Sequence, residues 1–184
     1  ISAEMIADKW DISRTELDEL GVRSHARALQ ATEEGRFERE MVPMTVGDET
    51  YMTDQGIRPG TSVETLAGLK PAFKEDGKIT AGNASQVSDG AAAVMLMSRE
   101  KADELGLKAR ARIVDTTTVG VDPVIMLTGP IPATRKILER NSMGIGDVDL
   151  VEINEAFASV VLAWEKELQP DMDRVNVNGG AIAI

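Results

Sequence analysis

The chain has 184 residues, with 20 lysines and arginines against 31 aspartates and glutamates, which gives a net charge of −11. This acidic balance argues against a nucleic-acid partner, because such partners require a basic face that replaces phosphate counterions. Hydrophobic residues make up 42%, enough for a buried core, and no apolar run approaches the roughly 18 residues that cross a membrane. There is no cysteine, which excludes disulfides, thiolate metal sites and a thiol nucleophile within these residues.

The first third of the chain begins with two predicted helices. Residues 3–9 favour a short helix, and Ser13 with Glu16 forms a capping box that opens a second helix running to about Thr32. His25, the single histidine, lies on this second helix between charged residues. We therefore expect its imidazole at a solvated surface.

Two short strands and a short helix are predicted next. Residues 40–45 and 50–52 favour strands, with Gly47-Asp48 as the turn between them. Thr61 and Glu64 form a second capping box, which predicts a helix that ends at about residue 69, before Lys70-Pro71. Because strands and helices do not alternate here, we interpret the first third as loop-rich.

The pattern changes near residue 78. Residues 79–85 are mostly small, so their backbone could approach a ligand closely, although a tight turn beside a buried strand fits equally well. Strands are then predicted at 91–97 and 111–119, with helices from Ser98 to before Gly106 and over 133–140. This alternation is typical of α/β layers around a largely parallel sheet.

Asn154 lies at a predicted strand-to-helix junction. The apolar run 149–153 indicates a strand, and an amphipathic helical stripe begins at Phe157. Open α/β sheets place ligand sites at such junctions. The alternative is that Asn154 is only the N-cap of the following helix, and spacing by itself favours this simpler interpretation.

Three segments carry motifs that occur together: Thr80–Ser85 with Asp89–Ala92, Asn154–Ala158, and Asn176–Ala183, with the linking stretch Val119–Ala133 between them. In order and spacing they resemble the thiolases, a family of acyl-CoA C-acyltransferases. The resemblance implies a layered αβαβα fold, present here only in part. Residues 1–78 would belong to an inserted, loop-rich, CoA-binding domain, residues 79–114 would end the N-terminal half, and residues 115–184 would begin the C-terminal half.

The chemistry that the resemblance implies is thiolytic cleavage of a 3-ketoacyl-CoA, or the reverse Claisen condensation. It requires two thiols, an activating histidine and hydrogen-bond donors for the developing oxyanions. Asn154 matches the family asparagine that helps to hold the water donating to the enolate oxygen, a role that suits a neutral amide. The family's two cysteines and its histidine fall outside these residues, so we expect a longer parent to be active and the 184-residue chain alone to be inactive.

The resemblance also implies coenzyme A and acyl-CoA as substrates, with no permanently bound cofactor and no metal. Arg58 would lie near the nucleotide end, and Ser85 would contact the pantetheine amides, with Ala81 leaving room for that arm. The walls of the pantetheine and acyl channel would be Phe73, Met126, Ala156 and Phe157. For Phe157 and Met126, a plain core position is an equally good interpretation.

A second hypothesis is a non-catalytic, thiolase-like protein that binds acyl-CoA or lipid, suggested by the lack of cysteine beside intact CoA-wall residues. It predicts saturable CoA binding by this chain alone. The family implies a homodimer or homotetramer without membrane contact, and catalytic thiols suit a reducing compartment such as the cytoplasm. Residues 85–89 and 151–153 lean toward degradative 3-ketoacyl-CoA thiolases over biosynthetic acetoacetyl-CoA enzymes.

Overall fold

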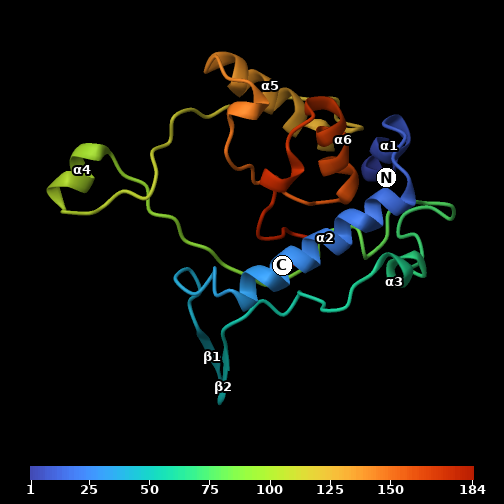
Figure 1. Ribbon diagram of the computed structural model, residues 1–184, viewed down its shortest axis with the longest axis horizontal. Helices are drawn as coiled ribbons and strands as arrows, with labels where there is room; N and C mark the ends of the chain where they lie inside the picture. The colour runs from blue at the N-terminus through green and yellow to red at the C-terminus, as the bar shows by residue number, and fades with distance from the viewer.

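The structure is a computed structural model that describes residues 1–184. Its α-helices are α1 (Ser2–Lys9), α2 (Arg14–Glu33), α3 (Val63–Ala67), α4 (Arg99–Glu104), α5 (Pro130–Arg140) and α6 (Ala158–Leu168). Its strands are β1 (Met44–Val46) and β2 (Glu49–Tyr51), and its short 3₁₀ helices are η1 (Met126–Thr128), η2 (Ile145–Asp147) and η3 (Met172–Arg174). The long helix α2 runs through the middle of the molecule, with α1 and α6 near one end and the β1–β2 hairpin beyond the other (Figure 1).

Helix α2 begins where its sequence predicts. Ser13 is the N-cap, its hydroxyl accepts a hydrogen bond from the Glu16 amide at 3.2 Å, and the Glu16 carboxylate accepts one from the Ser13 amide at 2.7 Å. This reciprocal pair satisfies two backbone donors that the first helical turn leaves free. The capping box predicted from Ser13 and Glu16 is therefore confirmed.

The hydrophobic core lies between α1, α2 and α6. It is one cluster of 15 buried residues, in which Ile6, Leu17 and Trp164 are among the largest side chains. Trp164 is 1% exposed, and its indole N–H donates to the Thr134 hydroxyl at 3.0 Å, which ties α6 to α5. A buried indole needs such a partner for its N–H, so this contact fixes how the two helices meet.

The predicted strands at 91–97 and 111–119 are wrong for this structure. Both segments run without strand partners and expose apolar side chains, for example Val94 at 83% and Ile113 at 63%. An apolar run becomes a strand only where another strand satisfies its backbone groups, and no segment of this chain does so here. The hairpin with its turn at Gly47 is confirmed, although β1 begins at Met44 rather than residue 40.

Several predicted boundaries shift. The α3 N-cap is Ser62 with Thr65 as its box partner, instead of Thr61 with Glu64, and α5 begins three residues early, at Pro130. The predicted strand 149–153 is reduced to a single parallel bridge between Val151 and Val175. The N-cap of α6 is Phe157, so the interpretation of Asn154 as that cap is wrong. None of the helices combines the length and the hydropathy needed to cross a membrane.

Candidate functional site

One face of α2 carries the segments that hold the predicted site residues. Asp18, Gly21, Ser24 or His25, and Ala28 follow one another at intervals of three or four residues, so they form a single stripe along the helix. The stripe is small and polar, which lets other backbones approach closely. A Cβ atom added at Gly21 would collide with the Gly82 carbonyl, and one added at Gly179 would lie 2.6 Å from the Ala28 Cβ.

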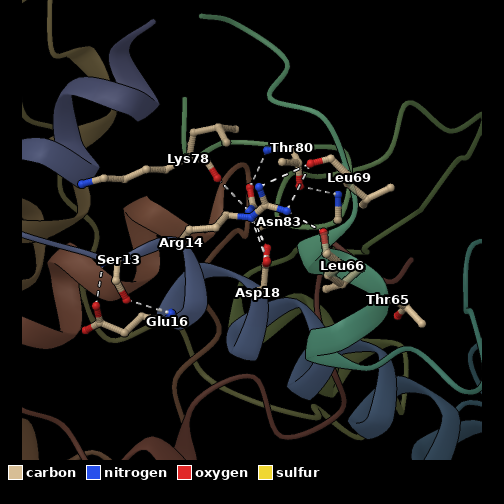
Figure 2. Close-up of polar contacts among 12 residues, drawn as sticks. Ser13, Arg14, Glu16, Asp18, Thr65, Leu66, Leu69, Lys78, Thr80 and Asn83 are labelled. Atoms are coloured by element: carbon tan, nitrogen blue, oxygen red, sulfur yellow. Dashed lines mark hydrogen bonds and ion pairs between the residues drawn. The ribbon is translucent and has the colours of Figure 1, made fainter. Parts of the chain in front are cut away.

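The small-residue segment 78–85 forms a tight turn that packs against this stripe of α2. The fully buried Asn83 accepts from the Thr80 amide at 2.9 Å and donates to the Asp18 carboxylate at 2.8 Å and the Lys78 carbonyl at 3.1 Å (Figure 2). Asp18 also accepts from Arg14 Nε at 2.7 Å. A buried amide with its donors and acceptor satisfied rigidifies the turn. The tight turn is therefore confirmed, but the buried strand expected beside it is not, because residues 91–97 are exposed and unpaired. Close approach of this backbone to a ligand stays a prediction.

The turn pairs with the segment after Asn154. The Ser85 amide donates to the Ala156 carbonyl at 3.1 Å, and Ala84 forms an antiparallel bridge with Phe157. The Ala158 amide donates to the Asn83 carbonyl at 2.9 Å, which satisfies a first-turn donor of α6 that the Phe157 side chain cannot cap. Three predicted residues, Ser85, Ala156 and Phe157, are thereby brought together from distant parts of the sequence.

Phe73 joins this group through its ring. The centroids of Phe73 and Phe157 lie 5.8 Å apart at an interplanar angle of 73°, an edge-to-face contact. Phe73 remains 45% exposed and Phe157 is half-buried. The Phe73 ring is therefore accessible to solvent, whereas Phe157 is partly buried and packs against the hydrophobic core cluster, as the core interpretation expects.

Arg58 reaches the same region through Gln86. The Gln86 amide donates to the carbonyls of Gly56, Ile182 and Ala183 at 2.9, 3.1 and 3.0 Å, and its oxygen accepts from the Arg58 guanidinium at 3.3 Å. Gln86 thus joins the loop of Arg58 to the turn of Ser85 and to the end of the chain. Nothing in the sequence singles out Gln86, because all of its partners are far away along the chain.

His25 lies beneath the Arg58 loop and is only 6% exposed, so the predicted solvated imidazole is wrong. The helical context that suggested a surface position could not reveal that a distant loop covers it. His25 Nδ1 accepts from the Arg58 backbone amide at 3.2 Å. Burial, and secondarily the positive charge of Arg58, lower the pKa of His25 below its usual value, so the neutral imidazole is favoured.

Asn154 itself is exposed, and its side-chain amide makes no hydrogen bond. Its neighbours are held firmly. The Asn176 side chain accepts from the Ile153 amide and donates to the Ile153 carbonyl, both at 2.9 Å, and Glu155 is buried with its carboxylate accepting three hydrogen bonds. A free amide is thus presented between two fixed residues, an arrangement suited to donating a hydrogen bond to a ligand or a bound water.

Two predicted residues are less well connected to the group. Ala81 is exposed beside the Asn83 turn. Met126 is 60% exposed on η1, which packs on α1, α5 and α6, and no ring contact or hydrogen bond joins its side chain to the other predicted residues. The role predicted for Met126 stays a prediction.

A cavity lies away from these residues. It measures about 670 Å³, lies between α2 and α6, and is lined by none of the predicted site residues. Its lining is mostly charged and includes Arg23, Glu165 and Lys166. No group of three or more histidine, aspartate or glutamate side chains is arranged to hold a metal ion. The candidate site therefore rests on the exposed Asn154 and Ser85 and on the Phe73–Phe157 pair.

Comparisons with known proteins match both parts of the chain to models of one protein family. Residues 1–100 match the family model described as "Thiolase, N-terminal domain", and residues 107–184 match "Thiolase, C-terminal domain". The chain is 51% identical to an acetyl-CoA acetyltransferase of Shinella zoogloeoides over 187 aligned residues, which cover 100% of this chain and 48% of that protein.

Two solved structures have nearly the same fold. Human mitochondrial 3-ketoacyl-CoA thiolase in complex with CoA superposes with a TM-score of 0.96 at 44% identity, over 100% of this chain and 46% of that one. The dimeric peroxisomal thiolase of Saccharomyces cerevisiae superposes with a TM-score of 0.95 at 44% identity, over 100% and 47%. The chain spans about half the length of the relatives it matches.

Proposed function

Because the chain belongs to the thiolase family, we propose that it forms part of an acyl-CoA C-acyltransferase. The reaction is CoA-dependent cleavage of a 3-ketoacyl-CoA or the reverse condensation of two acyl-CoAs. The predicted layered αβαβα fold is that of the solved relatives, of which this chain represents about half. The two thiols and the histidine of this chemistry would come from residues outside the 184 given, since these residues contain no cysteine and their single histidine is buried.

The observation that carries the proposal is the convergence of Asn154 with Ser85 and the Phe73–Phe157 pair. The contacts between residues 83–85 and 156–158 bring the exposed Ser85 next to the Phe73–Phe157 pair, and the exposed Asn154 lies two residues before this paired segment. An extended amphipathic ligand such as the pantetheine arm requires that combination of apolar wall and few polar contacts. Asn154 then donates toward the oxyanion side of the reaction, through a water.

Coenzyme A is the proposed substrate, with Arg58 at its nucleotide end and Ser85 and Ala81 along the pantetheine. Phe73, Met126, Ala156 and Phe157 would wall the channel. The relatives named above include an acetyl-CoA acetyltransferase and a 3-ketoacyl-CoA thiolase, so acetoacetyl-CoA and longer 3-ketoacyl-CoAs are both candidate substrates. A homodimer, as described for the yeast relative, and a cytoplasmic location belong to the same proposal.

The complete gene product that contains these residues should cleave acetoacetyl-CoA or longer 3-ketoacyl-CoAs only when CoA is added. Asn154→Ala should lower kcat by roughly 10²- to 10³-fold, the usual loss for one oxyanion donor, with little change in KM. Glu152→Ala, an exposed change two residues away, is the matched control and should leave kcat unaltered.

Two outcomes would overturn the proposal. One is a complete gene product that contains both cysteines and the histidine but cleaves no 3-ketoacyl-CoA. The other is an Asn154→Ala variant with wild-type kcat. In the first case, isothermal titration of the 184-residue chain with CoA separates the alternatives, because saturable binding without turnover would favour the non-catalytic acyl-CoA-binding protein.

A further inference from the structure

Glu155 is a buried carboxylate with no cation at ion-pair distance, although Arg23 and Arg27 line the same small cavity. Its residue is 2% exposed, and it forms no ion pair. Burying an ionised carboxylate is unfavourable unless hydrogen bonds replace its hydration. Three donors do so here: the Ser24 hydroxyl at 2.6 Å, the Asn176 amide at 2.9 Å and the Ile182 backbone amide at 3.2 Å. The group cannot reach a substrate, yet it is immediately next to Asn154.

The first consequence of these bonds concerns the backbone on both sides of Asn154. The Asn176 side chain holds the N–H and the C=O of Ile153, as a neighbouring strand would, and the same Nδ2 donates to Glu155. The parallel bridge of Val151 and Val175 is thus continued by a side-chain amide. Asn176 has a φ of 47°, a left-handed conformation that asparagine tolerates better than most residues.

The second consequence concerns the glycine-rich segment 179–184. Glu155 accepts from the Ile182 amide, and its partner Ser24 accepts from the Gly180 amide at 3.1 Å. A Cβ atom added at Gly180 would collide with the Glu155 carboxyl group, so the segment packs directly on the carboxylate. One buried charge therefore connects three parts of the chain: α2, the segment after Asn154 and the segment 176–184.

We propose that Glu155 is a positioning residue that fixes the Asn154 amide relative to the segment 179–184. This proposal rests on the proposed function, in which Asn154 helps to stabilise an oxyanion. The carboxylate is suited to the role because all three of its partners are donors. A glutamine in its place has the same shape but presents N–H₂ to at least one of these donors, which leaves that donor without a partner.

The test uses the complete gene product with Glu155→Gln, Asn154→Ala and the double variant. Glu155→Gln should lower kcat roughly 10- to 100-fold, the scale expected when a catalytic group is displaced by about 1 Å, with little change in the KM for CoA. Because Glu155 acts through Asn154, the double variant should be no slower than Asn154→Ala alone. Glu152→Gln, which removes a neighbouring carboxylate that forms no hydrogen bond, is the control and should retain wild-type kcat.

Multiplicative losses in the double variant would overturn the proposal, because they would mean that Glu155 acts independently of Asn154. So would a Glu155→Gln variant with wild-type kcat. Glu155→Asp keeps the charge but is one methylene shorter, and it should recover part of the lost kcat.

Hydrogen exchange on the same proteins provides a readout that does not depend on activity. Glu155→Gln should speed exchange of the amides in both 151–157 and 179–184, while α5 and the Glu152→Gln control stay at the wild-type rate. If the wild-type protein cleaves no 3-ketoacyl-CoA, the proposed function fails. Faster exchange in both segments of Glu155→Gln would still support the structural link that Glu155 makes between them. Unchanged exchange in either segment would refute the link itself.

Discussion

The close approach of α2 to the Asn83 turn gives a sharp prediction for Gly21→Ala. In an exposed helix interior this change stabilises by about 1 kcal/mol, because alanine is the better helix former. Here the new Cβ would collide with the Gly82 carbonyl and lie 3.3 Å from Leu66 Cδ1. Leu66 can rotate away, but the Gly82 carbonyl belongs to a fixed turn. In this turn the Gly82 N–H donates a hydrogen bond to Thr80 Oγ1 at 3.1 Å, and the Asn83 side chain accepts one from the Thr80 N–H.

Overpacking against such a fixed obstacle costs about 1–3 kcal/mol, and the gain in helix propensity offsets part of it. We expect Gly21→Ala to lower the free energy of unfolding by about 1–2 kcal/mol. The displaced turn carries Ser85, which is proposed to contact the pantetheine arm, so the KM of the complete gene product for CoA should rise more than kcat falls.

Urea denaturation followed by circular dichroism measures the stability difference, with Gly146→Ala as the control. A Cβ added at Gly146, in η2, meets nothing within 4 Å. That control should be unchanged or up to about 1 kcal/mol more stable. If Gly21→Ala is as stable as Gly146→Ala, the reasoning from the Gly82 contact is wrong.

Two further predictions follow from the same helix face. Asp18→Ala should destabilise by about 2–4 kcal/mol, because it leaves the buried Asn83 amide and the partly exposed Arg14 without their shared partner. A loss below 1 kcal/mol in urea denaturation, on the scale of an exposed pair, would contradict it. The pKa of His25 is lowered in the folded protein, so on acidification the unfolded chain binds the proton first. The contribution of His25 to the free energy of unfolding is therefore complete above about pH 6.5 and is lost as the pH falls toward the folded pKa. His25→Asn, whose oxygen can replace Nδ1 as acceptor, should flatten that loss between about pH 7.5 and 5.5, whereas parallel curves for variant and wild type would count against this assignment.

Local patterns in the sequence predict the elements whose determinants are close together. The capping box of Ser13 and Glu16 and the hairpin turn at Gly47 depend on contacts within a few residues, and both form as predicted. The family resemblance of the segments at 80–92, 154–158 and 176–183 is confirmed by the family models and by the superposed relatives. The individual roles of Arg58, Phe73, Ala81, Ser85, Met126, Asn154, Ala156 and Phe157 stay predictions, as do the domain boundaries.

The misplaced predictions share one physical cause, which is dependence on distant partners. The segments 91–97 and 111–119 have strand composition but no neighbour to pair with, and His25 has a surface pattern but lies under the Arg58 loop. A capping residue was predicted at Asn154, yet the Asn83 carbonyl satisfies the first turn of α6.

The sequence by itself determined the family and the presence of the helices, because these follow from short motifs and local hydrogen bonds. Only the tertiary structure decided how Asn154 is held. Glu155 and Ser24 are 131 positions apart, and Asn176 reaches Ile153 across 23. A buried carboxylate is stable only where the fold brings its donors together, and no spacing in the sequence records that meeting.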